Sequence, residues 1–190
     1  MKINKSYTTT RCPWAANDSL LQNYHDHRWC KPVHDEHELF ALLILEGFSV
    51  GLSWKLILQK ETLIRENCND LKPESCARYD EKKEKQLMEL PGMIHHQGKI
   101  RSIGINARAF LNIQTEFGSF DRFIWQYTER KTIDHKASDM SLVPTRTPLS
   151  EQISKDLKKR GFQYLGPTIL YSYMQSIGMV NDHLTSCPFR

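Results

Sequence analysis

Two cysteine and histidine pairs lie near opposite ends of this 190-residue chain. His183 and Cys187 are four positions apart, a spacing by which one helical turn presents two side chains on the same side. Cys12 and His25 lie near the start and are too far apart to form a local chelate. Thiolate and imidazole are ligands that zinc prefers, and four of them close a tetrahedral structural site. The spacing alone leaves two interpretations equally open: a zinc site, or unrelated thiols and histidines.

If the four residues meet, a metal ion ties residue 12 to residue 187. Because the entropy of loop closure rises only logarithmically with length, so long a cross-link restricts the unfolded chain by on the order of several kcal/mol. All four ligands would come from the protein, which leaves no coordination position for water, so we expect one structural Zn²⁺ ion rather than a catalytic one. His27 and Cys30 are close enough in sequence to His25 to compete as ligands.

Glu46 is a third group with chemical potential, and it follows the most apolar stretch of the chain, "HDEHELFALLIL". Near the C-terminal end of a helix the macrodipole disfavours a negative charge, and burial there would raise the pKa of the carboxyl. A carboxylate with a purely structural role is more favourable at the other end. A helix that ends at Gly47 would leave Glu46 in solvent, and the local pattern alone favours this exposed position.

The elements that must position these residues are helices. Asp35 and Glu38 can form a capping box before a nearly all-round apolar segment at 39–45, which predicts a central helix. A polar, proline-containing stretch at 131–148 predicts a long surface connection, and no alternating strand pattern is present. The sequence therefore predicts an all-α fold, with further helical patterns at 53–67, 73–79, 80–90, 99–113, 119–129, 150–160 and 167–177.

The composition is that of a globular protein, with 39% hydrophobic and 25% charged residues. No apolar run approaches the roughly 20 residues that span a bilayer, and the first residues lack the hydrophobic stretch of a signal peptide, so we expect no membrane partner and a cytoplasmic location. Five cysteines without a repeating spacing argue against a disulfide framework. The net charge of +4 permits a polyanionic partner without requiring one. We expect a flexible tail at residues 1–10 and a single domain at 11–190.

Several segments together resemble the DNA-3-methyladenine glycosylase I family, a zinc-containing branch of the helix-hairpin-helix DNA glycosylases. They are, in chain order, "RCPW", "YHDHRW", "LEGFSVGLSW", "LPGMIHHQGKI", "LKKRGFQYLGPTILYSYMQSIGMVNDH" and the terminal Cys187. The resemblance runs from about residue 11 to the end. It implies two interlocked helical lobes, with zinc joining the N- and C-terminal segments. It also implies hydrolysis of the N-glycosidic bond of N3-methyladenine, with 3-methylguanine as a further substrate, leaving an abasic site without strand cleavage.

Residue by residue, the resemblance implies a ligand set, an acid and an aromatic pocket. The zinc ligands fall on Cys12, His25, His183 and Cys187, the base-recognising acid on Glu46, and the pocket aromatics on Trp14, Tyr24, Trp29 and Trp54. A purine methylated at N3 is cationic, and aromatic faces attract cations and stack on a flipped base, at roughly 1–3 kcal/mol per base. Without the resemblance, core packing is the commoner role of such aromatics beside apolar helices.

A DNA-binding hairpin is expected near residues 88–102. Gly92 and Gly98 would allow backbone N–H groups and a helix N-terminus to approach a phosphate, and Lys99 and Arg101 would add charge and salt dependence. Pro-Gly turns join helices in many proteins, so this pattern alone is unspecific, and Ile94 stands where the wider superfamily has a second hairpin glycine. The resemblance also implies that the catalytic aspartate of most superfamily members is missing, and no Asp occurs between residues 90 and 120.

Three residues depart from the family pattern. Ser49 and Val50 stand where many relatives have a segment with glutamine, which leaves the base preference open, and Cys30 replaces a frequent glycine. We expect alkylated double-stranded DNA as the partner, 3-methyladenine as the product, and a monomer. The alternative is a non-catalytic, zinc-stabilised module that binds DNA or damaged bases. A zinc hydrolase would need an open coordination position, which four protein ligands exclude.

Overall fold

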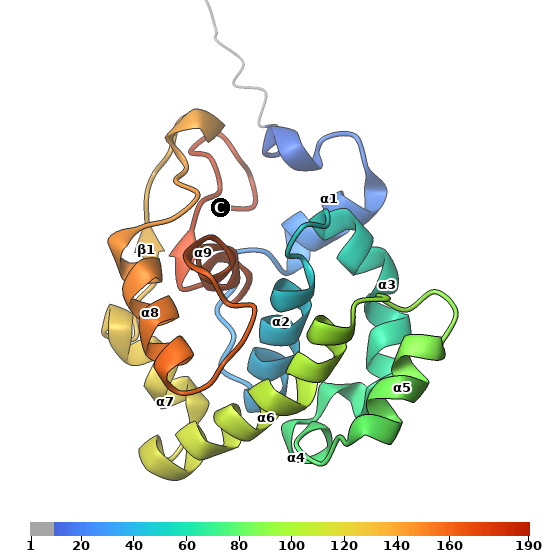
Figure 1. Ribbon diagram of the computed structural model, residues 1–190. Helices are drawn as coiled ribbons and strands as arrows, with labels where there is room; N and C mark the ends of the chain where they lie inside the picture. The colour runs from blue at the N-terminus through green and yellow to red at the C-terminus, as the bar shows by residue number, and fades with distance from the viewer. Residues whose placement is uncertain (1–9) are drawn as a thin grey trace, which may run out of the picture.

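The protein is described here by a computed structural model that covers residues 10–190, and its regular structure is almost entirely helical (Figure 1). The α-helices are α1 (Ser19–His27), α2 (Glu36–Phe48), α3 (Trp54–Asn67), α4 (Pro73–Cys76), α5 (Glu81–Glu89), α6 (Gln97–Phe117), α7 (Phe120–Trp125), α8 (Pro148–Lys159) and α9 (Pro167–Ser176). Four 3-10 helices complete them: η1 (Pro13–Ala15), η2 (Asn69–Leu71), η3 (Gln126–Thr128) and η4 (Met140–Leu142). The predicted all-α class is confirmed. The expected tail at 1–10 lies outside the described residues except for its last residue.

A short parallel strand pair was not predicted. β1 (Ile133–Asp134) pairs with β2 (Val180–Asn181), and the backbone N–H of Ile133 donates to the carbonyl of Met179 at 2.9 Å. Two residues per strand are too few to leave an alternating pattern in the sequence. The pairing fastens the long connection at 131–148 to the C-terminal segment.

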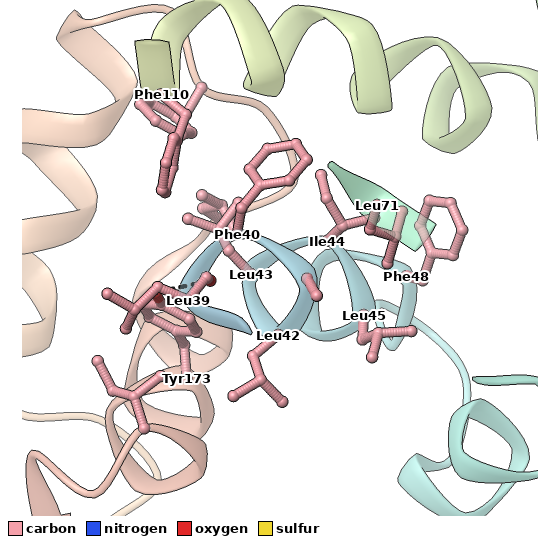
Figure 2. Close-up of a cluster of buried hydrophobic side chains, with 14 of the residues drawn as sticks. Leu39, Phe40, Leu42, Leu43, Ile44, Leu45, Phe48, Leu71, Phe110 and Tyr173 are labelled. Atoms are coloured by element: carbon pink, nitrogen blue, oxygen red, sulfur yellow. Dashed lines mark hydrogen bonds between the residues drawn. The ribbon is translucent and has the colours of Figure 1, made fainter. Parts of the chain in front are cut away.

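Helix α2 is the central element of the core. It contacts α3, α6, α7 and α9, and Figure 2 shows its leucine and phenylalanine side chains leaving the helix in all directions. A helix without a polar face has no side to present to water, so its sequence requires this central position. Asp35 caps α2 as predicted by accepting from the N–H of Glu38 at 2.8 Å, whereas the Glu38 carboxylate pairs with Arg65.

The borders of the helices that flank the site follow local rules. Ser53 caps α3 by accepting from the N–H of Leu56 at 3.2 Å, as predicted. Pro167 is the first residue of α9, where its missing N–H costs nothing. Gly161 and Gly178 follow α8 and α9 with φ of +94° and +71°, the left-handed conformation that ends many helices.

A second, smaller group of buried side chains brings the N- and C-terminal segments together beside α1. The ammonium group of Lys31 donates to the carbonyl of Phe189 at 3.1 Å, and the Arg11 guanidinium lies 5.2 Å from the centre of the Phe189 ring. This group contains cysteine, tyrosine and tryptophan residues predicted to form the site. None of the helices within residues 10–190 combines the length and the hydropathy needed to cross a membrane.

Candidate functional site

The four predicted metal ligands form one buried cluster. Cys12 precedes η1, His25 lies on α1, and His183 and Cys187 follow β2. Their potential ligand atoms all lie within 4.8 Å of one another, and all four residues are buried. His183 and Cys187 lie in a turn rather than a helix, in which the N–H of Cys187 donates to the carbonyl of Leu184 at 2.8 Å. The cluster could therefore hold a metal ion.

The distances in the cluster match a tetrahedral site. The Sγ of Cys187 lies 3.6 Å from Nε2 of His25 and 3.5 Å from Nδ1 of His183, and the Sγ of Cys12 lies 3.9 Å from the same Nδ1. Bonds of about 2.3 Å to sulfur and about 2.0 Å to nitrogen place tetrahedral ligands roughly 3.5 Å apart. Burial raises the pKa of the Cys12 thiol, so a thiolate here needs a cation beside it. The donor set fits a four-coordinate ion such as Zn²⁺.

Both histidines are oriented by hydrogen bonds from the ring nitrogen that faces away from the cluster. The Nδ1 of His25 lies 2.8 Å from Asp26, whose carboxylate also binds Arg11 in a bidentate pair. The Nε2 of His183 lies 3.3 Å from the carbonyl of Trp29. Such partners fix the ring orientation and keep the other nitrogen free for a metal. Asp26 was not predicted to be part of the site, although it directly follows His25.

The competing ligands lie outside the cluster. The Nδ1 of His27 lies 3.0 Å from the carbonyl of Asn23 at the surface. The Cys30 sulfur accepts from the N–H of Asp182 at 3.4 Å. Cys30 has a φ of +59°, the conformation that favours glycine, which gives a physical reason for the glycine expected at this position.

A cavity of about 400 Å³ lies beside the cluster, within the range of small-molecule sites. Glu46 and all four predicted aromatic residues line it: Trp14, Tyr24, Trp29 and Trp54. The remaining lining residues are Ser49, Leu52, Met140, Ile169, Ser172 and Gln175. Residues from five separate segments of the chain thus face one space.

The cluster of cysteine and histidine residues shares a wall with the cavity. The rings of Trp14 and Trp29 pack edge to face with their centres 4.9 Å apart. Behind them, Trp14 contacts the ring of His25 at 5.3 Å and Trp29 contacts His183 at 4.7 Å. Two of the cavity's indoles therefore rest directly on two candidate metal ligands.

Tyr24 and Trp54 form a further part of the wall, with ring centres 5.4 Å apart. Burial raises the pKa of the Tyr24 phenol well above its usual range, so the hydroxyl keeps its proton and can donate. Within residues 10–190, the indole N–H of Trp54 is the single fully buried side-chain nitrogen or oxygen without a hydrogen-bond partner.

Glu46 is buried, with 3% of its surface exposed, although the local sequence pattern favoured solvent. That alternative is wrong because α2 continues past Gly47 to Phe48 and packs against α9, while the loop between α8 and α9 covers the neighbouring Gly47. A Cβ atom on Gly47 would lie 3.7 Å from Cβ of Tyr164. Burial raises the pKa of Glu46 to about 8, and a hydrogen bond from the Ser176 hydroxyl opposes that rise.

The raised pKa predicts a pH-dependent stability. Because the folded-state pKa of Glu46 is about 8 and its ordinary value is 4.5, its stability contribution is complete below pH 4.5 and is lost as the pH rises through 8. In Glu46→Gln this loss is absent. We expect the variant to gain on the order of 4 kcal/mol over the parent between pH 5 and pH 9. Urea unfolding of both proteins across this range measures the difference, and a pH-independent difference would contradict the assignment.

The predicted hairpin is the connection from α5 to α6. Gly92 is exposed with a φ of +81°, and the side chain of Arg101 on α6 is 56% exposed. Gly98 lies in the first turn of α6, where a Cβ atom would lie 2.1 Å from the Tyr164 hydroxyl. Gly98 therefore has a packing reason to be glycine.

Lys99 differs from its expected role as a phosphate ligand. Only 4% of its surface is exposed, and its ammonium group donates to the carbonyls of Phe48 and Val50. A charge directed into the protein is not presented to a phosphate. The prediction assumed a solvent-facing lysine, and only the packing of α6 against the end of α2 determines the opposite orientation.

Further lining residues on α9 were missed. Ser172 and Gln175 lie three positions apart on α9, and the Gln175 side-chain amide donates to the buried carboxylate of Asp182 at 2.8 Å. Tyr171 donates to the same carboxylate oxygen at 2.6 Å. Polar residues at helical spacing within an otherwise apolar segment were the available signal, and the other unidentified lining residues, such as Met140 and Ile169, left none.

The helical fold places a ring-lined cavity with a buried acid directly beside a Cys₂His₂ cluster. Comparisons with known proteins identify the class of protein. The sequence model of the methyladenine glycosylase family matches residues 14–190, and the chain belongs to this family.

Individual relatives agree over nearly the whole chain. The DNA-3-methyladenine glycosylase of Haemophilus influenzae is 40% identical over 180 residues, which cover 95% of this chain and 97% of the relative. A crystal structure of a 3-methyladenine DNA glycosylase I superposes with a TM-score of 0.91 at 39% identity, covering 94% of this chain and 98% of the other. A variant of such an enzyme in complex with 3-methyladenine also gives 0.91, at 36% identity, covering 94% and 96%.

Proposed function

We propose that this protein is a DNA-repair glycosylase that flips N3-methyladenine out of alkylated double-stranded DNA and hydrolyses its N-glycosidic bond. The observation that carries the proposal is the buried carboxyl group of Glu46 in a cavity lined by four aromatic residues. Membership of the methyladenine glycosylase family supports it, as does the relative solved with 3-methyladenine.

The cavity can distinguish a cationic purine from a neutral one. With the cavity empty, Glu46 has a pKa of about 8, so its protonated form predominates at neutral pH. A cationic base favours the carboxylate, because an opposite charge in a desolvated site lowers the pKa of the acid. The faces of Trp14 and Trp29 attract the same positive charge. Neutral adenine offers no such compensation, so the geometry favours the methylated base.

The reaction follows from the charge of the lesion. The bond between C1′ of the sugar and the base nitrogen breaks, and its electron pair neutralises the cationic base, which leaves as 3-methyladenine. Water adds to C1′ and releases a proton, which leaves an abasic site. Glu46 and the aromatic rings that line the cavity bind and orient the base. No Asp occurs between residues 90 and 120, so we propose no aspartate base in α6. Strand cleavage needs an amine nucleophile, and no lysine is among the residues that line the cavity, so we propose hydrolysis without strand cleavage.

We propose that the Cys₂His₂ cluster of Cys12, His25, His183 and Cys187 binds one structural Zn²⁺ ion. Bound there, the ion supplies charge for two thiolates and a cross-link between the two chain ends. The four protein side chains fill a tetrahedral shell, so the ion has no part in the chemistry of the base. The indoles that rest on His25 and His183 make the cluster a support for the cavity wall.

We propose that the hairpin between α5 and α6 holds the DNA backbone. Gly92 exposes backbone at the turn, and the guanidinium of Arg101 supplies a solvent-facing charge. We expect residues 11–190 to act as a single domain and the protein to act as a monomer, which size-exclusion chromatography with light scattering tests.

Base release separates the enzyme from the alternative, a non-catalytic module that binds damaged DNA. Duplex DNA treated with a methylating agent is incubated with the protein, and the free bases are separated by chromatography. We expect 3-methyladenine, with 3-methylguanine as a further product, in amounts that grow with time. Tight binding of the same DNA without release of 3-methyladenine above background would reject the enzymatic proposal and leave the binding module.

A further inference from the structure

Lys99 is a buried cation without an acidic partner. Its side chain makes no ion pair with any residue between 10 and 190, and its ammonium group donates instead to the backbone carbonyls of Phe48, at 2.9 Å, and Val50. Burial lowers the pKa of the lysine, so keeping the charge there costs free energy. A costly buried charge that binds only backbone carbonyls indicates that those carbonyls need to be held in place.

The two carbonyls belong to the turn that ends α2 and forms the rim of the cavity. Helix α2 ends at Phe48, and the following residues include Ser49 and Leu52, which line the cavity. The last carbonyls of a helix have no partner within the helix, and the negative end of its dipole favours a cation. Lys99 supplies both the hydrogen-bond donors and the positive charge. The carbonyl of Phe48 that it binds lies two residues beyond Glu46 at the end of α2.

The other end of the contact is the hairpin. Lys99 lies in the first turn of α6, and its backbone N–H donates to Nδ1 of His96, the residue that caps this helix. The ring of Tyr164 reaches across the same gap, since its hydroxyl lies against Gly98 on α6 and its Cβ against Gly47 on α2. The start of α6 and the end of α2 are thus fastened at two points.

We propose that Lys99 is a positioning residue that couples the DNA-holding hairpin to the rim of the base cavity, rather than a ligand for a phosphate. This coupling holds the mouth of the cavity in a fixed position relative to the DNA that the hairpin binds. This inference rests on the proposed glycosylase function. A displacement of about 1 Å in a reacting geometry can cost on the order of 100-fold in rate, so even a small relaxation of the rim is measurable.

The test compares Lys99→Met with Arg101→Gln, and Lys131→Met serves as a control because the Lys131 side chain is 79% exposed and lies outside the site. The rate of 3-methyladenine release is measured with enzyme in excess over a methylated duplex. Affinity for an uncleaved duplex is measured between 50 and about 200 mM salt. For Lys99→Met we expect a release rate roughly 10- to 100-fold lower, with affinity within about 2-fold of the parent and an unchanged salt slope. For Arg101→Gln we expect weaker binding and a salt slope smaller by about 1.

The outcomes separate the inference from its premise. If the parent protein releases no 3-methyladenine, the proposed function fails. If the parent is active and Lys99→Met keeps its rate but loses affinity and salt slope, Lys99 is a phosphate ligand and the inference is wrong. Thermal unfolding checks each variant, and Lys99→Arg, which keeps the charge and can reach a carbonyl, provides a folded form if the methionine variant unfolds. We expect Lys99→Arg to release 3-methyladenine faster than Lys99→Met. A release rate in Lys99→Arg as low as that in Lys99→Met would also reject the inference.

Discussion

We expect the replacement of Glu46 by glutamine to lower the rate of 3-methyladenine release by about 100-fold or more, with the fold and the metal content unchanged. The amide keeps the size of the side chain but carries no charge, so the cavity loses the interaction with the positive base that a desolvated carboxylate provides. Removal of one preorganised electrostatic partner from a buried site has an effect of this size. Single-turnover release of 3-methyladenine from methylated duplex measures it.

Glu129→Gln is the matched control, because the Glu129 side chain is 86% exposed and lies outside the site. We expect it to match the parent in rate. Circular dichroism tests whether Glu46→Gln is folded, and elemental analysis tests whether its metal content equals that of the parent. An unchanged release rate in a folded Glu46→Gln protein would show that the acid has no part in base recognition.

Loss of one cysteine ligand is the second large effect that we expect. Cys187→Ser removes a thiolate from the cluster, so we expect the variant to lack the one equivalent of zinc that we propose for the parent. In the proposed site the ion would link residues 171 positions apart, as between Cys12 and His183. A cross-link over more than a hundred residues restricts the unfolded chain by on the order of 5 kcal/mol, and we expect a loss of unfolding free energy of that order. Elemental analysis and urea unfolding measure the two losses.

Cys30→Ser is the matched control for the metal. Cys30 is buried close to the cluster, but its sulfur accepts from the N–H of Asp182, which a serine hydroxyl can also do. We expect this variant to keep its zinc. Retention of zinc at full stoichiometry in Cys187→Ser would show that the ligand set is incorrect. The indoles that pack against His25 and His183 provide another measurement, since loss of the metal should change the fluorescence of Trp14 and Trp29.

The sequence predicted the helical core because the information is local. The stretch from Leu39 to Leu45 is apolar on all sides and follows a capping aspartate, so both its helical state and its central position follow from adjacent residues. Gly161 and Gly178, which follow the ends of α8 and α9, are also signals that can be identified from the local sequence. The short strand pair left no pattern, because two residues per strand form no alternation.

The site was only partly predictable because its determinants are distant in sequence. Spacing could not decide whether Cys12 and His183 meet, and the family resemblance was needed to propose it. The burial of Glu46 depends on the packing of α2 against α9, which lies more than a hundred residues later in the chain. The orientation of Lys99 depends on carbonyls about fifty residues earlier. Each is a property of tertiary packing, which neither composition nor periodicity encodes.

The positions of the four candidate ligands in the sequence also set an order of events during synthesis. His25 and Cys187 are 162 residues apart, so a growing chain exposes half of the ligand set long before the ribosome has made the other half. The wall formed by Trp14 and Trp29 cannot be completed in that interval, because its support includes His183. A nascent chain therefore completes the cavity wall only after His183 has been translated. A product that terminates before this residue lacks the finished cavity.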